Sequence, residues 1–293
     1  MRDAAKESPQ WLLYFSQESN SMEREKSFTA GFIVIAALAA VGLALQMTIG
    51  PLDWAILHWP VNAMGLTAFI TILAIASIWR ENCRAIRWLA SLDAAVPSLL
   101  ATGAATVIYG ITGNPSTLSN WSFVLIYAFM TTSLGLTCIK RLNFKMNNIP
   151  FLLNHIGLFI VLVCAALGSA DREELKMAVN EAHPQWHAVD DRGFGYTPGF
   201  ALRLDSFSEE SFISELTVYK PEADSFKIKV SVNHPHTLDG WKIYQSGYDS
   251  YGDGAVSILS LIRDPWLPAV YVGIFMMLAG AVTLLLTKRA ARK

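Results

Sequence analysis

The sequence has little charge. Only 16% of its 293 residues are Asp, Glu, Lys or Arg, whereas soluble globular proteins carry about 25%. A membrane-spanning helix needs about 20 mostly apolar residues, and five uncharged stretches reach that length. This pattern excludes a soluble enzyme, a nucleic-acid-binding protein and a disordered chain. The five stretches make up half of the chain and comprise residues 27–52, 54–79, 94–139, 146–170 and 265–287.

Cysteine is also scarce. The three cysteines are Cys83, Cys138 and Cys164, and none lies between residues 170 and 266. Their positions exclude a disulfide framework and a Cys-x-x-Cys redox site in that segment. We expect all three to be small buried residues or reduced thiols.

The uncharged stretches predict six membrane spans. The stretch 94–139 is too long for one helix, and Gly113-Asn114-Pro115-Ser116 is typical of a turn inside it. The first 28 residues are polar and lack the layout of a signal peptide, so we expect the first span to be retained. The predicted spans are 29–49, 64–79, 94–112, 121–139, 150–169 and 267–287.

Lysine and arginine predict the orientation of these spans. They gather in alternate connections, while the short loops 50–63 and 113–120 contain neither. By the positive-inside rule both termini are cytoplasmic, and residues 170–266 lie on the outer, periplasmic side of a bacterial-type inner membrane. The basic residues that carry this prediction are Arg2, Lys6, Arg24, Lys26, Arg80, Arg84, Arg87, Lys140, Arg141, Lys145, Lys288, Arg289, Arg292 and Lys293.

Residues 170–266 form the one long soluble segment, and they read as a β domain. Apolar and polar residues alternate over 200–204 and 226–232, and 241–244 and 256–262 are also strand-like. Glycines, among them Gly252, separate these runs. We therefore expect an α-helical polytopic membrane protein with a small antiparallel β domain inserted between helices five and six. The expected parts are a cytoplasmic segment 1–28, three spans in 29–112, two spans in 121–169, the β domain 170–266, and the last span with a basic tail in 267–293.

His155 is the main candidate functional residue. It lies in the apolar run from Phe151 to Gly157, about 7 Å inside the cytoplasmic edge of its span. An ionisable group at membrane depth is costly and marks a functional site by default. The alternative is a neutral histidine bonded to a neighbouring helix, with Asn154 as a local partner, and burial alone leaves both open. Gly157 leaves room for a flat ligand or for a second helix.

A neutral histidine in apolar surroundings is suited to be an axial ligand of a haem iron. A bis-histidine site needs a second ligand, and the sequence has no second histidine deep in a span. We expect any second ligand to come from a partner. The other histidines are weaker candidates: His58 fits an interfacial position, His183 and His187 have i, i+4 spacing around a proline, and His234 and His236 flank Pro235 in a turn.

The second half of the chain, about residues 120–287, resembles the ResB/CcsB family, the membrane subunits of system II cytochrome c maturation. Four stretches carry the resemblance in the expected order. They are Trp121 to Arg141, the Phe151-Leu152-Leu153-Asn154-His155-Ile156-Gly157 run, Val232-Asn233-His234-Pro235 followed by the strand Gly240 to Asp249, and Arg263-Asp264-Pro265-Trp266-Leu267-Pro268.

The resemblance implies a function. Proteins of this family work with a CcsA-like membrane partner, and together they carry haem across the bilayer and attach it to apocytochrome c. The family's transmembrane histidine would fall on His155, as an axial ligand of a haem b shared with the partner. The chain would then be a haem-transporting, accessory subunit of a cytochrome c haem-lyase complex, with no catalytic residue and no metal except the haem iron.

Two other functions stay open from the residues. One is a quinol-linked electron-transfer or anchor subunit of a respiratory reductase, which would hold a redox-active haem without any partner. The other is a structural anchor whose β domain docks a soluble protein. In that case deletion of 171–262 would abolish complex formation, while His155→Ala would have no effect.

Overall fold

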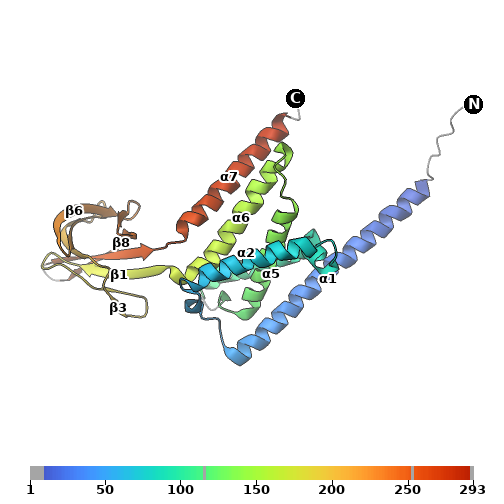
Figure 1. Ribbon diagram of the computed structural model, residues 1–293. Coiled ribbons are helices and arrows are strands. Elements are labelled where there is room, and N and C mark those ends of the chain that lie inside the picture. Colours follow the sequence, from blue (N-terminus) through green and yellow to red (C-terminus); the bar gives the residue numbers. More distant parts are fainter. Residues whose placement is uncertain (1–9, 115–116, 252–253, 291–293) are drawn as a thin grey trace, which may run out of the picture. The chain divides into compact units, whose positions relative to one another are not determined.

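Each uncharged stretch forms helix in the computed structural model, which describes residues 10–114, 117–251 and 254–290 (Figure 1). The chain divides into a helical unit, residues 1–167 and 269–293, and a β unit, residues 168–268. Several residues used above lie outside the described residues: Arg2, Lys6, Pro115, Ser116, Gly252, Arg292 and Lys293.

Among the described residues, six helices are long and apolar enough to cross a membrane, and an antiparallel sheet lies between the fifth and the sixth of them, so the predicted fold class is confirmed. Four shorter pieces in the described residues, η1 (Trp54–Leu57), α3 (Arg84–Leu89), η3 (Met146–Asn148) and η4 (Ser169–Asp171), lie in the connections and were not predicted. The six are α1 (Gln10–Ile49), α2 (Val61–Trp79), α4 (Leu92–Thr112), α5 (Trp121–Lys140), α6 (Ile149–Gly168) and α7 (Leu267–Ala290).

The break in the longest apolar stretch has a local cause. Gly113 ends α4 in the left-handed conformation, with φ +61°, and its N–H donates to the carbonyl of Tyr109. The side chain of Asn120 then caps α5 by accepting from the N–H of Ser122 at 2.8 Å. A left-handed glycine and an asparagine cap are common signals for the end and the start of a helix. The two therefore convert one apolar run into two helices.

Small residues bring the helices together. A Cβ on Gly31 of α1 would meet Pro97 of α4 at 2.7 Å, and one on Gly42 would meet the backbone of Trp121 at 2.7 Å. Hydroxyl groups then bond across the contacts, from Ser122 to the carbonyl of Ala39 at 2.8 Å and from Ser133 to that of Leu89 at 2.7 Å. Close backbone approach and interhelical hydrogen bonds hold helices together where lipid removes the hydrophobic driving force.

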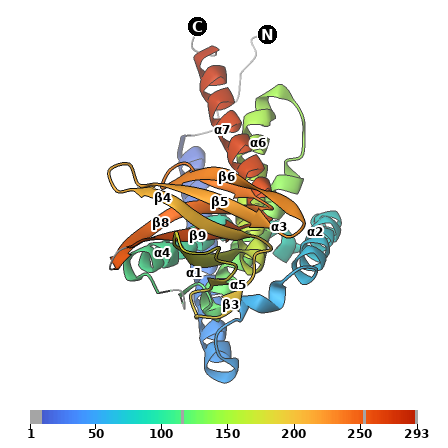
Figure 2. The ribbon, with the colours of Figure 1, turned by 90° about the vertical axis from the view of Figure 1, so that its left-hand side faces the viewer.

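The β unit is built of two antiparallel sheets, which Figure 2 shows lying across one another. The six-stranded sheet has the order β3-β2-β1-β9-β8-β7, and the three-stranded sheet has the order β4-β5-β6. Strands were predicted within β4, β6, β8 and β9, whereas the other five were missed. The strands are β1 (Glu173–Val179), β2 (Ala188–Val189), β3 (Gly195–Tyr196), β4 (Ala201–Ser208), β5 (Ile213–Lys220), β6 (Ala223–Ser231), β7 (His236–Leu238), β8 (Trp241–Tyr251) and β9 (Gly254–Arg263).

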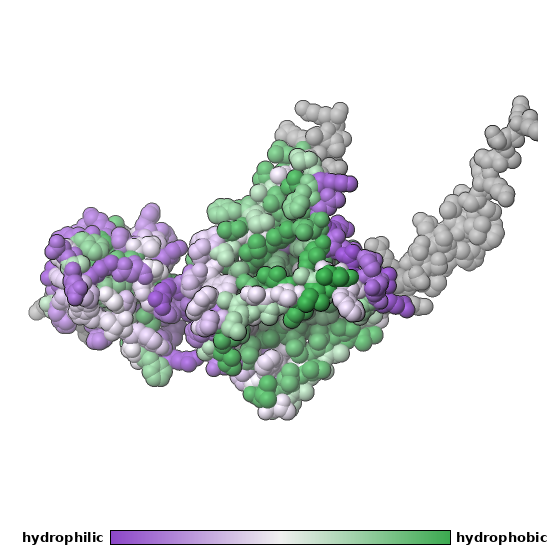
Figure 3. Space-filling view, viewed as in Figure 1, coloured by the Kyte–Doolittle hydropathy of each residue, from purple (hydrophilic) through white to green (hydrophobic). Residues whose placement is uncertain are grey.

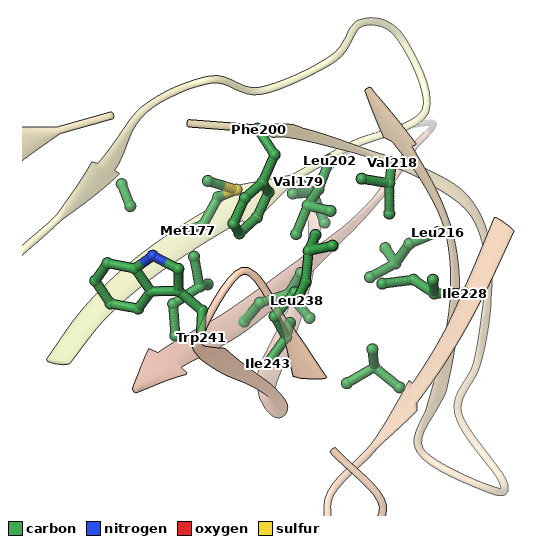
Figure 4. Close-up of a cluster of buried hydrophobic side chains, with 14 of the residues drawn as sticks. Met177, Val179, Phe200, Leu202, Leu216, Val218, Ile228, Leu238, Trp241 and Ile243 are labelled. Atoms are coloured by element: carbon green, nitrogen blue, oxygen red, sulfur yellow. The ribbon is translucent and has the colours of Figure 1, made fainter. Parts of the chain in front are cut away.

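The core of the β unit lies between the two sheets (Figure 4). Met177 and Ile243 of the larger sheet meet Leu202, Leu216 and Val218 of the smaller one, and each is fully buried. Alternate residues of a strand point to the same face, so the strands bury one row and expose the next. The alternation that predicted the strands therefore also builds the core.

The β unit begins and ends at one place. Glu173 and Arg263 face each other at the ends of β1 and β9 and form an ion pair at 2.6 Å. The indole N–H of Trp266 donates to Asp171 at 2.7 Å, and Asp264 accepts from the N–H groups of Trp266 and Leu267. Asp264 thus caps the start of α7. We call this end, residues 168–173 and 263–268, the attachment end of the β unit.

Candidate functional site

His155 lies on α6, six residues after the first residue of the helix. Its Nδ1 is 2.9 Å from the carbonyl oxygen of Phe151. A carbonyl can only accept a hydrogen bond, so in the neutral imidazole this contact makes Nδ1 the donor and leaves the lone pair on Nε2. A second bond of this kind fixes the tautomer and the ring orientation of metal-binding histidines. The geometry therefore leaves Nε2 as the nitrogen that can bind a metal.

An aromatic stack holds the imidazole. The rings of Phe151 and His155 are stacked with their centroids 3.8 Å apart and an angle of 23° between the planes. The guanidinium carbon of Arg141 lies 4.6 Å from the centroid of the Phe151 ring, a cation–π distance. Arg141, Phe151 and His155 therefore form a three-membered stack that joins the end of α5 to the start of α6.

The loop between α5 and α6 positions this stack. The amide group of Asn148 donates to the carbonyls of Arg141 and Asn143, each at 2.7 Å. The side chain of Asn143 accepts from the N–H of Lys145 at 3.2 Å. Asn148, at the end of the loop, thus hydrogen-bonds to its first residue and keeps Arg141 beside Phe151.

Asn154 and Gly157 lie where α6 packs on α7, since a Cβ on Gly280 of α7 would meet the side-chain amide carbon of Asn154 at 2.8 Å. The amide of Asn154 donates to the carbonyl of Pro150 at 2.8 Å. A Cβ on Gly157 would come within 2.6 Å of the carbonyl oxygen of Gly273. Of the two uses that the sequence left open for Gly157, the structure shows the close approach of a helix.

The opposite face of α6 packs on α2 and α5. Phe159 stacks on Phe69 with centroids 6.1 Å apart, and a Cβ on Gly135 would meet its ring at 2.9 Å. At 100° per residue, His155 lies between this face and the face that contacts α7. Its side chain is accordingly only half-buried. The imidazole is held at its base, and part of it stays open at the flank of the helix.

The other histidines lie outside the six candidate spans. His58 is exposed between η1 and α2. His183 and His187 lie in a loop that contains no helix, and Nδ1 of His187 is 3.4 Å from the hydroxyl of Thr197. Within the described part of the chain, no three His, Cys, Asp or Glu residues gather as a metal site would require. The three cysteines are free and lie in the helical unit, Cys138 and Cys164 buried.

A charged cluster on the smaller sheet has a structural role. Asp205 is near Arg203 at 3.1 Å and Lys227 at 3.2 Å, and it accepts from the hydroxyl of Thr217 at 2.7 Å. Burial alone would raise the pKa of Asp205, but these hydrogen bonds outweigh burial and lower it. Because the cluster spans β4, β5 and β6, it joins all three strands of that sheet.

The sequence singled out His155 as a candidate, but not the two residues whose side chains stack beside it. Phe151 precedes His155 by four residues, the spacing at which side chains meet on a helix, and Arg141 ends the preceding span. An aromatic residue at that spacing beside a basic helix end was a usable signal. The placement of Arg141 also depends on Asn148, whose two bonds could not be derived from the sequence.

The fold and site define a polytopic membrane protein with a two-sheet β unit before its last span and one imidazole within the spans. Residues 145–261 match the ResB-like family, so the resemblance is confirmed over that segment, which includes His155. The solved structure of "Cytochrome c Heme Lyase CcmF" is similar with a TM-score of 0.35 and 14% identity, covering 88% of this chain. The chain spans 44% of that structure, and a likeness of this degree defines no function here. No curated protein matched the chain.

Proposed function

We propose that this protein is a membrane subunit of cytochrome c biogenesis and that Nε2 of His155 is one axial ligand of a haem shared with a partner. The ResB-like match over 145–261 supports the first part, since that family serves cytochrome c maturation. The single observation that carries the second part is the bond from Nδ1 of His155 to the Phe151 carbonyl, which leaves Nε2 free.

The residues around His155 fit half of a haem site. The Phe151 ring fixes the imidazole plane, and the open flank of α6 gives a planar ligand access to Nε2. Arg141 places a fixed cation at the same end of the helix, and guanidinium groups pair well with carboxylates such as those of a haem. No other histidine of the chain lies within a candidate span. The second ligand is therefore assigned to a CcsA-like partner.

The orientation follows from the basic residues. We place both termini in the cytoplasm and the β unit on the outer side of the inner membrane, since Arg80, Arg84, Lys140 and Lys145 then share the cytoplasmic side. His155 is about 9 Å along α6 from the start of the helix, at 1.5 Å per residue. Its position suits a haem b that enters from the cytoplasmic side.

The task of this chain is to bind and to orient. Haem brings the vinyl groups to which the apocytochrome thiols add, and the protein supplies position and a site without water. The β unit provides the soluble surface on which apocytochrome c and the partner can assemble. The chain is thus an accessory subunit with no catalytic residue of its own.

The test is the haem content of the complex purified with its CcsA-like partner. We expect His155→Ala to lose most of the bound haem b and to lower the yield of c-type cytochromes. His58→Ala is the matched control, because His58 is the other histidine of the helical unit and lies outside the spans. Unchanged haem and cytochrome yield in His155→Ala would overturn the assignment. A stable redox-active haem in the isolated chain would favour a quinol-linked subunit instead.

A further inference from the structure

The β2–β3 hairpin exposes an unusual amount of apolar surface for a soluble element. Phe194 is 64% exposed and Tyr196, two residues further along, is 47% exposed; Val189 is 44% exposed on the other face of the hairpin, since its neighbour Ala188 pairs with Tyr196. Exposed aromatic side chains that lie close together mark an interaction surface. The hairpin lies at one edge of the larger sheet, and β3 is the edge strand.

The turn of this hairpin has a fixed shape. Asp190 accepts from the N–H groups of Arg192 at 2.9 Å and Phe194 at 2.8 Å, and its own N–H donates to the carbonyl of Phe194 at 3.0 Å. Gly193 takes a φ of +83°, which favours glycine. Asp190 thus stabilises the turn and fixes the backbone position of Phe194.

The strand register shows which way the turn points. Val189 pairs with Lys176, and β2 runs antiparallel to β1. Beyond Val189 the chain therefore advances toward Glu173, at the attachment end, and away from Val179. Three residues separate Lys176 from Glu173, about 10 Å at 3.3 Å per residue. The turn 190–194 accordingly lies at the attachment end of the β unit.

We propose that the β2–β3 hairpin, residues 188–196, inserts Phe194 into the headgroup layer of the bilayer leaflet from which α6 and α7 emerge. Aromatic residues favour this layer, and a tyrosine keeps its hydroxyl in contact with water there. The hairpin carries Asp190, Asp191 and Arg192 as its only charges, so it is not a polybasic, anion-selective element. Zwitterionic lipid is therefore sufficient.

The β4–β5 turn provides a matched control within the same unit. It also carries acidic residues, Glu209 and Glu210, beside an exposed phenylalanine, Phe212. The ring of Phe212 lies 5.8 Å from that of Tyr248, whose β9 partner Ser257 pairs with Val179. Since Val179 and Glu173 are about 20 Å apart along β1, this turn is at the end of the β unit away from the attachment end.

The test uses the full chain in phosphatidylcholine nanodiscs, in a Cys83→Ser background with unmodified protein as the labelling blank. A nitroxide is attached at Asp191→Cys or at Glu209→Cys, and its collisions with oxygen and with a water-soluble nickel chelate are measured. We expect nickel collisions to be several-fold lower at 191 than at 209, with higher oxygen collisions. Adding Phe194→Ser to Asp191→Cys is expected to remove the protection without moving the label.

Three results would overturn the proposal. Equal nickel collisions at the two positions would mean that the hairpin stays in water. Protection that persists in the Phe194→Ser variant would mean that Phe194 is not the inserted group. Protection that arises only after a partner protein is added would assign the hairpin to a protein interface.

Discussion

The two units place their apolar residues in opposite ways. In the β unit Leu216, Ile243 and Leu261 are fully buried between the sheets, whereas in α4 Ile111 is 80% exposed and in α2 Ile78 is 75% exposed. Figure 3 shows the helices presenting apolar side chains on their surface, while the β unit presents polar ones. Each unit therefore matches the solvent around it, water for the sheets and lipid for the helices.

Polar groups show the complementary difference. In the helical unit single polar side chains join helices, as Tyr127 does by donating to the carbonyl of Leu162 at 2.8 Å. In the β unit they form closed networks, as where Ser214 and Ser257 both bond to Gln245. In lipid, apolar contact gives little driving force for helix association, and interhelical hydrogen bonds contribute to it instead. In the sheets such bonds satisfy polar groups that are buried in the core.

Truncation of a fully buried residue between the two sheets should have the largest effect. We expect Leu216→Ala to lower the free energy of unfolding of the β unit by about 2–5 kcal/mol, because it leaves a cavity. Ile111→Ala removes the same kind of side chain from a surface that faces lipid, and its effect on α4 should be far smaller. Hydrogen exchange of β5 and α4 in the full chain in micelles measures both, and equal effects would contradict the comparison.

Overpacking should be the second largest effect, and it should act where helices touch. We expect Gly157→Val to destabilise the helical unit by about 1–3 kcal/mol, because its Cβ would come 2.6 Å from the carbonyl oxygen of Gly273. Gly103→Val is the control, since a Cβ at Gly103 meets nothing within 4 Å. Thermal unfolding of the two variants in micelles makes the measurement. A larger loss in Gly103→Val would refute the packing of α6 on α7.

The smallest of the three effects should come from the charges of the smaller sheet. Asp205→Asn should cost about 1–2 kcal/mol, because Asp205 loses charge-assisted bonds to Arg203 and Lys227. Glu215, whose pKa is lowered by its hydrogen bond from Lys229, has a side chain that is 43% exposed, so Glu215→Gln should cost less. Hydrogen exchange of β5 and β6 in the full chain distinguishes the two.

The same aspartate predicts a pH dependence. The pKa of Asp205 is lower in the folded than in the unfolded chain, so its contribution is complete above the unfolded value of about 3.9. It is lost as the pH falls below that value and through the folded pKa. Asp205→Asn should reduce the acid sensitivity of the smaller sheet, and an unchanged acid transition would contradict the role given to this carboxylate.

The length of the uncharged stretches was enough to predict the six spans, and apolar–polar alternation predicted part of the β unit. The turn at Gly113 and the strands within β4, β6, β8 and β9 follow from local pattern alone. β1 was missed because Glu173, Glu174 and Lys176 interrupt its apolar residues, and it forms because β9 pairs with it along its whole length. Pairing between residues so far apart in the sequence leaves no local signal.

The candidate site shows the same limit. His155 stood out because an imidazole in an apolar run is rare. The bond from Nδ1 to Phe151 and the contact of Phe151 with Arg141 depend on rotamers and on the loop that Asn148 ties. A pairing of Asn154 with the imidazole was one of two alternatives left open by the sequence, and in the structure Asn154 donates to the carbonyl of Pro150. His155 could thus be selected as a candidate from the sequence pattern, whereas the positions of the side chains around it depend on how α5, α6 and α7 pack.

One measurement tests the central claim most directly: the haem stoichiometry and absorption spectrum of the His155→Gly variant, purified with its partner, with and without imidazole. If Nε2 of His155 is an axial ligand, His155→Gly loses the haem, and added imidazole restores both the haem and the low-spin spectrum. Full haem content with an unchanged spectrum in His155→Gly without imidazole would contradict the claim.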